Sequence, residues 1–297
     1  MSGRSGAVPR QGAGLACSVA SSAGPWHTAG VRGNSNRSSR LAFDSAVDRY
    51  DAGRPAFGAE VVTDLIALAE LCPGDLVLEV GAGTGQLTAG LVDRGLAVIA
   101  VEPGPNMAAC LRRRFADRSG LTVVESHFEH FDYPAGSFAA VLSANAFHWA
   151  DPSVSYHKAA GLLRSDGRLG LMWTFPILAD RDLQRRVNDE AFVDDLADFR
   201  REPDGYLAEL ESLLADGRAE LTGSGGFHEP AWVMKTQRLV WTVADYIAFL
   251  SSMANGIAVA DQISKRVTRV LAGVEELKIA NHVYVEAAKK MTSPLSL

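Results

Sequence analysis

The chain has few cysteines, no long apolar run and no excess of basic charge. Three cysteines, Cys17, Cys72 and Cys110, lie far apart without a C-x-x-C pair. They indicate neither a disulfide framework nor a zinc site, and they favour a reducing compartment, the cytoplasm. No apolar run reaches the roughly 18 residues of a membrane-spanning helix, and no basic amphipathic helix favours a membrane surface. The net charge of −6 argues against a broad nucleic-acid-binding face.

Acidic residues are absent from the first 43 residues, which carry five arginines and are rich in glycine, serine and alanine. No apolar core follows the basic start, so a secretory signal is a poor fit. A transit peptide has a similar composition, but the many glycines and two prolines would break its amphipathic helix. We therefore predict that residues 1–42 form a disordered tail and that ordered structure begins near Phe43.

The stretch Leu76–Gln86 is the most informative part of the chain. Four of its first five residues are apolar, which predicts a buried strand. Gly81, Gly83 and Gly85 follow at alternate positions, and apolar residues then recur at helical spacing over 86–92. Glycine serves where the backbone takes a positive φ or approaches a ligand closely. This pattern of strand, turn and helix predicts a loop that holds a small ligand against the backbone.

The spacing of the glycines limits the classes of ligand that this loop can bind. A dinucleotide fingerprint requires a glycine at position 86, where this chain has Gln86, and no lysine follows to make a phosphate loop. Glu102 lies at the end of the next predicted strand, where an acid can accept both ribose hydroxyls of a nucleoside. An ordinary surface glutamate and a nicotinamide-dependent oxidoreductase are the alternatives at this point.

Strands alternate with helices over the first two thirds of the chain. This predicts an α/β fold with a doubly wound, Rossmann-like, mostly parallel sheet. We divide it into a cofactor-binding core at 43–178, a helical insertion or lid at 179–230, and a C-terminal part at 231–297 that completes the sheet. The predicted strands are 76–80, 96–101, 121–124, 137–143, 168–174, 232–243 and a last edge strand at 282–285. The predicted helices are 60–71, 86–92, 106–116, 155–163, 243–253 and 259–271, with more helix within 180–217.

Five motifs in order carry a resemblance to a known family. They are Tyr50–Pro55, Glu79–Gln86, Val101-Glu102-Pro103 with Met107, Ala144–Pro152 and Leu162–Leu169. Residues 43–178 resemble the class I methyltransferases that use S-adenosylmethionine and act on small molecules. The branch is similar to the trans-aconitate methyltransferases.

The resemblance implies a set of cofactor contacts. The loop of Gly81, Ala82, Gly83, Thr84 and Gly85 would lie against the methionine part, with Glu79 near its ammonium and Asn145 at the same end. Glu102 would bind the ribose, and the adenine would meet Pro103, Met107, His127 and Phe128. The family often has an acid or a small polar residue where this chain has His127. Tyr50, Arg54 and Trp149 would close over the acceptor, with Arg54 facing a carboxylate of cofactor or substrate.

Methyl transfer places few demands on protein side chains. The cofactor supplies an activated methyl group, and the protein aligns the reactants and excludes water. A base is needed only if the acceptor must lose a proton, and His148 is the candidate. The alternative is that Phe147-His148-Trp149 packs as an aromatic wedge. We expect no metal, because His127 and His130 lack a third ligand in the sequence.

The resemblance predicts an enzyme that methylates a small, partly apolar acceptor, with a carboxylate or a hydroxyl as the candidate position. The Asn/Asp-Pro-Pro-aromatic run of enzymes that methylate amino groups of nucleic acids is absent, so a nucleic-acid acceptor is not expected. A regulator or scaffold that binds the cofactor without turnover is the alternative from another class. No oligomeric state is predicted.

Overall fold

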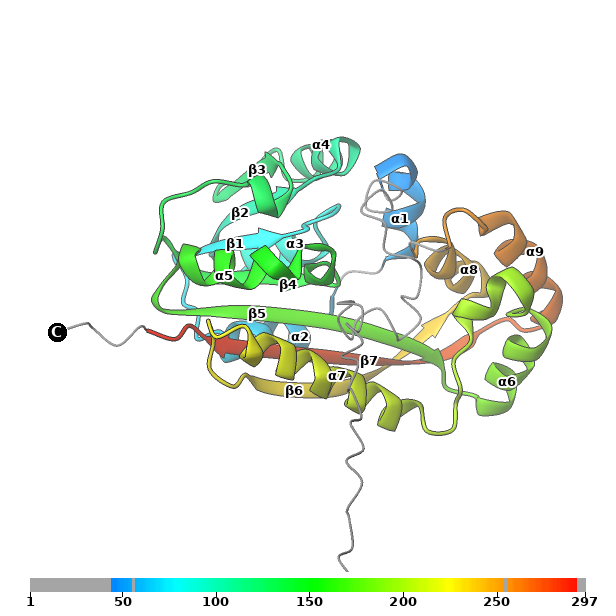
Figure 1. Cartoon of the computed structure of the whole chain (residues 1–297). Helices are drawn as coiled ribbons and strands as arrows, with labels where there is room; N and C mark the ends of the chain where they lie inside the picture. Colours follow the sequence, from blue (N-terminus) through cyan, green and yellow to red (C-terminus); the bar gives the residue numbers. More distant parts are fainter. Residues whose placement is uncertain (1–43, 55–56, 254–255, 293–297) are drawn as a thin grey trace, which may run out of the picture.

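A seven-stranded sheet forms the centre of the computed structural model, which describes residues 44–54, 57–253 and 256–292. The predicted tail at 1–42 and Phe43 lie outside these residues. The strand order is β3-β2-β1-β4-β5-β7-β6, and β7 runs antiparallel to both of its neighbours (Figure 1). The strands are β1 (Leu76–Val80), β2 (Ala97–Glu102), β3 (Leu121–Glu125), β4 (Phe138–Ala144), β5 (Leu163–Leu178), β6 (Ala231–Trp241) and β7 (Leu277–Lys289). The predicted doubly wound, mostly parallel α/β fold is confirmed.

Helices cover both faces of this sheet. Helices α2 (Ala59–Leu68), α3 (Gln86–Val92) and α4 (Pro105–Arg114) bury Leu65, Leu91 and Leu111 on one face. Helices α5 (Pro152–Leu162) and α7 (Tyr206–Gly223) cover the other face, with Leu162 and Leu214 in its core (Figure 1). Burial of apolar surface on both faces explains the nearly continuous apolar runs of the central strands. Among the described residues, no helix is long and apolar enough to cross a membrane.

A third apolar cluster lies beyond one end of the sheet. It joins α6 (Arg181–Glu190), the 3-10 segment η6 (Asp194–Phe199), α8 (Val243–Ser251) and α9 (Ala260–Val270) (Figure 1). Phe192 and Ile263 are fully buried in it. The segment predicted as one insertion is therefore divided. Its first part, α6 and η6, packs with helices from after β6, whereas α7 returns to the sheet.

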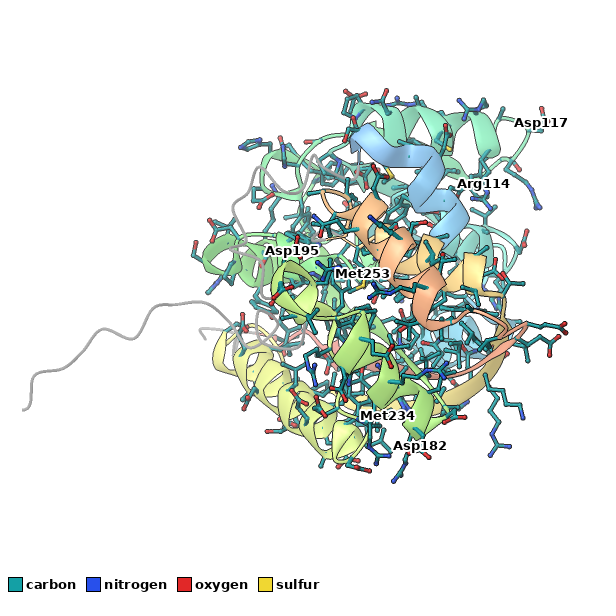
Figure 2. The ribbon with its side chains drawn as sticks, turned by 90° about the vertical axis from the view of Figure 1, so that its right-hand side faces the viewer. Arg114, Asp117, Asp182, Asp195, Met234 and Met253 are labelled. Carbon is teal, nitrogen blue, oxygen red and sulfur yellow. The ribbon has the colours of Figure 1, made fainter. Side chains whose placement is uncertain are left out.

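A short N-terminal helix, α1 (Val47–Gly53), follows the 3-10 turn η3 (Asp44–Ala46) and lies between α4 and α8 (Figure 1). Sequence analysis did not predict it, because seven residues are too few to show helical periodicity. Asp44 Oδ1 accepts hydrogen bonds from the backbone N–H groups of Asn106 at 2.7 Å and Met107 at 3.0 Å. Asp51 Oδ1 accepts one from Arg114 at 3.0 Å, and Figure 2 labels Arg114 beside the blue ribbon of α1. Two carboxylates thus fix the segment to α4.

The predicted edge position of the last strand is wrong. Strand β7 spans Leu277–Lys289 and pairs with β5 on one side and β6 on the other. The pattern was misleading because Asn281, His282 and Glu286 interrupt the apolar run, yet all three are buried in the sheet. Strand β6 is the edge, and most of its residues are partly or fully exposed.

Other boundaries shift by a few residues. Helix α5 begins at Pro152 rather than 155, because the Asp151 side chain accepts from the Ser153 N–H at 3.1 Å and proline suits the first helical position. Strand β5 already begins at Leu163. It therefore starts before the predicted residue 168, and its pairing with β4 shifts register between Leu163 and Arg168. Helix α2 ends at Leu68, before the expected residue 71.

A buried polar cluster lies between β7 and α7. Glu286 is 1% exposed, and its Oε2 accepts a hydrogen bond from the Tyr284 hydroxyl at 2.8 Å. That hydroxyl accepts one from Arg218 at 3.0 Å, and the guanidinium also lies over the Trp232 ring. Burial raises the pKa of Glu286 to about 7 and raises the pKa of Glu220 on α7. The cluster therefore contains a carboxyl that ionises near neutral pH.

Candidate functional site

The glycine loop lies at the carboxyl end of β1, as predicted. Gly81, Gly83 and Gly85 have φ values of 71°, 58° and 96°, a region that other residues rarely adopt. A Cβ on Gly81 would also come within 2.5 Å of the Ala146 Cβ. Glycine is thus required there both for the backbone conformation and for the close approach of the loop to the end of β4.

Glu102 fastens this loop to the end of β2. Its Oε2 accepts a hydrogen bond from the Gly83 N–H at 2.8 Å, and its Oε1 accepts one from the Gly104 N–H at 2.9 Å. The side chain is 8% exposed, and burial raises its pKa although both hydrogen bonds oppose that shift. Each carboxylate oxygen has a second lone pair. The arrangement therefore leaves acceptor capacity for a pair of ribose hydroxyls, the role predicted for Glu102.

Glu79 lies under the loop and is 2% exposed. The Thr88 hydroxyl donates to its Oε2 at 2.6 Å. Burial raises the pKa of Glu79 to about 8, so the carboxyl is mostly protonated at neutral pH. A cation placed beside it would favour the ionised form. Glu79 thus has the chemistry needed to meet an ammonium group.

A first cavity opens at the ends of β1, β2 and β4. It collects most of the residues predicted to hold an adenosine, from four separate segments of the chain. Its lining includes Gly81, Gly83, Glu102, Pro103, Met107, His127, Phe128, Asn145 and Trp149. Glu129 also lines it and was missed, since nothing in the sequence distinguishes it from neighbouring acids. Trp149, predicted to face the acceptor, lies in this cavity.

A second cavity of about 430 Å³ adjoins the first. Tyr50, Arg54, Gly81 and Asn145 line both cavities. The second cavity also includes Glu79 and Ala82 from the loop, Thr174 and Pro176 from β5, Gln237 and Trp241 from β6, Phe249 from α8 and Asn281 from β7. Neither lining contains a residue of 179–230. Sequence analysis missed the β6, α8 and β7 contributions because only the tertiary fold brings them to the glycine loop.

Arg54 lines both cavities and forms no ion pair with another described residue. Its guanidinium lies 5.4 Å from the Tyr50 ring centroid and 5.2 Å from that of Phe249. Its Nε is buried without a hydrogen-bond partner, and no carboxylate in the described part of the chain forms an ion pair with it. Burial lowers the pKa of Arg54, although arginine remains charged. The side chain is half-buried and has no carboxylate beside it among the described residues, so this position suits an anion.

Asn145 shapes the boundary between the cavities. Its φ is 53°, in the left-handed region that asparagine tolerates better than most residues. Its Oδ1 accepts from the Thr174 N–H at 3.0 Å, and its Nδ2 donates to the Thr174 hydroxyl at 3.1 Å. These bonds hold the end of β4 beside β5. The Asn145 side chain is therefore held in one orientation beside β5.

Three predicted residues lie outside both linings. Thr84 is fully buried, and its hydroxyl donates to Asp51 Oδ1 at 2.6 Å; it fastens α1 to the loop. Gly85 precedes α3 and supports the turn. His148 is absent from both linings and lies beside Trp149, with 5.1 Å between ring centroids.

No group of three metal-ligating side chains occurs among the described residues.

Comparisons with known proteins agree with the fold and the loop. Residues 78–171 match the family model described as a methyltransferase domain. An uncharacterized methyltransferase of Mycobacterium tuberculosis is 41% identical over 139 residues, which are 47% of this chain and 54% of that protein. The chain thus spans about half the length of that relative. An uncharacterized methyltransferase of Geobacillus thermodenitrificans is 29% identical over 184 residues, covering 59% of this chain and 82% of the relative.

A solved structure shares the architecture. The structure described as a putative type II methyltransferase from Anaeromyxobacter dehalogenans superposes with a TM-score of 0.53 at 17% identity, over 80% of this chain and 97% of that one. Together with the domain match, this supports the class I methyltransferase fold that the motifs predict. A trans-aconitate-like branch finds no support in these matches.

Proposed function

We propose that this chain, which has a class I methyltransferase fold and a methyltransferase-domain match over 78–171, transfers a methyl group from S-adenosylmethionine to a small organic acceptor. The observation that carries the proposal is the pair of adjoining cavities. One gathers the residues suited to an adenosine, the other is free for an acceptor, and Gly81 and Asn145 line both. Methyl transfer requires the cofactor and the acceptor to meet at one point, and two adjoining cavities allow this.

The chain's residues bind and orient in this scheme. Glu102 accepts the ribose hydroxyls, and Glu79 becomes ionised beside the cofactor's ammonium. The bound cofactor supplies an activated methyl group on a sulfonium, together with its leaving group. Asn145 and the glycine loop fix the methionine end, while Tyr50 and α1 exclude water from the junction of the cavities. His148 as a base remains a proposal that needs a movement of its side chain toward the junction.

The second cavity favours a partly apolar acceptor with an anionic group. Phe249 and Trp241 contribute aromatic surface, and Arg54 contributes a cation that pairs with no carboxylate in the part of the chain that the structure describes. A carboxylate of the acceptor or of the cofactor itself would satisfy it. Methylation at a carboxylate or a hydroxyl is compatible with this lining. Three parts of the proposal rest on the sequence alone. They are a trans-aconitate-like branch, a cytoplasmic location and the absence of nucleic-acid and membrane partners.

The test is calorimetric titration of the purified chain with S-adenosylhomocysteine, with NAD as the comparison. Micromolar binding of the first and none of the second would support the proposal. Binding of NAD alone would refute it in favour of an oxidoreductase. A protein that binds S-adenosylhomocysteine but transfers no label from methyl-labelled S-adenosylmethionine to any acceptor of a broad small-molecule panel would be a regulator instead.

A further inference from the structure

A chain of three polar side chains leads from the surface to the second cavity. Gln237 Nε2 donates to Glu60 Oε1 at 2.7 Å, and Asn281 Nδ2 donates to Gln237 Oε1 at 3.1 Å. Gln237 and Asn281 are directly paired across β6 and β7, and all three residues line the cavity. Asn281 is 8% exposed, and its Oδ1 is buried without a hydrogen-bond partner in the described part of the chain.

The direction of these two hydrogen bonds is set at Glu60, the outermost of the three residues. Glu60 is exposed, and the hydrogen bond from Gln237 lowers its pKa, so it is ionised and can only accept. Gln237 must therefore turn its amide nitrogen toward Glu60 and its oxygen toward Asn281. Asn281 in turn must direct its amide nitrogen toward Gln237. The group left at the inner end is therefore a carbonyl oxygen, which requires a donor.

We propose that Asn281 Oδ1 accepts a hydrogen bond from a hydroxyl or amino group of the methyl acceptor. Glu60 and Gln237 are then positioning residues that select for such a donor. This inference rests on the proposed function, because it assigns the second cavity to the acceptor. With Arg54 in the same lining, the acceptor class becomes a small organic anion that carries a hydroxyl or an amine on an apolar body.

Calorimetry on protein saturated with S-adenosylhomocysteine tests the inference with three probes of similar shape. 3-Hydroxybenzoate carries a donor, 3-methylbenzoate has neither donor nor acceptor at that position, and 3-formylbenzoate has only an acceptor. The hydroxyl compound should bind about tenfold more tightly than the methyl compound, the scale of one buried hydrogen bond. The Asn281→Leu variant should bind both equally.

The Glu60→Lys variant tests the direction of these hydrogen bonds while Gln237 and Asn281 stay in place. A lysine can only donate, so Gln237 and Asn281 should both reverse, and the Asn281 amide nitrogen should face the cavity. Binding of 3-formylbenzoate should then improve relative to 3-methylbenzoate. Glu211→Lys, at an exposed position on α7, is the matched control and should keep the wild-type order of affinities.

The other possible results would refute either the inference alone or the proposed function together with it. Equal binding of the probes by the wild type, no binding of any probe, or an unchanged preference in both Asn281→Leu and Glu60→Lys would refute the inference alone. Weaker binding of S-adenosylhomocysteine but not of methylthioadenosine by Asn281→Leu would assign Oδ1 to the cofactor's ammonium and also refute it. Failure of the wild type to bind S-adenosylhomocysteine would refute the proposed function together with the inference.

Discussion

Replacing Glu286 by glutamine should change how stability depends on pH. The carboxyl lies in the buried cluster beneath α7, where it titrates near pH 7, against 4.5 for an exposed glutamate. The folded state therefore holds the proton more tightly than the unfolded state. The resulting stabilisation is fully present below pH 4.5 and is lost as the pH rises through 7.

The size of the effect follows from the two pKa values. One pKa unit corresponds to about 1.4 kcal/mol. Between pH 5 and pH 8, Glu286 alone should lower the free energy of unfolding by about 2.5 kcal/mol. Other groups with shifted pKa values, Glu79 among them, contribute to the wild type and the variant alike. The difference between the two profiles therefore isolates Glu286.

Urea unfolding at pH 5, 6, 7 and 8 measures this difference. The free energy of unfolding of the Glu286→Gln variant should fall by about 2.5 kcal/mol less than that of the wild type over this range. The variant's absolute stability is secondary, since its new amide needs its own partners. Glu211→Gln, at an exposed position, should follow the wild-type profile. Parallel profiles for wild type and Glu286→Gln would refute the assignment of a near-neutral pKa to this carboxyl.

Three further expectations concern the cofactor site and the N-terminus. Glu102→Ala should weaken S-adenosylhomocysteine binding by about 1.5–3 kcal/mol, and Glu102→Gln should also weaken it, because its amide nitrogen would face a backbone N–H; unchanged calorimetric affinities would exclude ribose binding. Glu79 should take the ionised form when the cofactor binds, so the wild-type affinity for S-adenosylhomocysteine should fall as the pH drops from 8 to 6. Glu79→Gln should remove that dependence on pH. A wild-type affinity that does not change with pH would contradict the ionisation of Glu79. Deleting residues 1–40 should leave Tm unchanged, whereas Asp44→Ala should lower stability by about 1 kcal/mol through loss of a helix cap; a large drop in Tm on deletion would show that the tail packs on the core.

Local patterns were sufficient for the parallel half of the fold. Residues 76–80 and the glycines after them form a strand and a loop because their apolar run and backbone requirements act over a few residues. The C-terminal half was harder. Strand β7 contains buried polar residues whose partners, such as Thr236 for His282 at 2.8 Å between Oγ1 and Nδ1, lie on other strands. A sequence window does not contain those partners, so the strand looked short and peripheral.

The same reasoning separates the two cavities. Apart from Tyr50 and Arg54, the first is built from residues at or just after the ends of β1, β2, β3 and β4, and the motif spacing predicted most of them. The second depends on β6, β7 and α8, which meet the glycine loop only through tertiary packing. Gln237 and Asn281 gave no signal in the sequence, because an amide is informative only when its partners are known. The role expected of His148 needs an orientation that sequence does not specify.

The placement of α1 makes one segment part of both cavities, which allows binding in one to affect binding in the other. Tyr50 and Arg54 belong to both linings, and Asp44 and Asp51 tie their segment to α4 and the glycine loop. A ligand that shifts α1 in one cavity changes the free energy of binding in the other. Linkage requires this effect to be reciprocal: whatever factor the cofactor adds to acceptor affinity, the acceptor adds to cofactor affinity. The segment from Tyr50 to Arg54 is therefore the place where binding in one cavity can change affinity in the other.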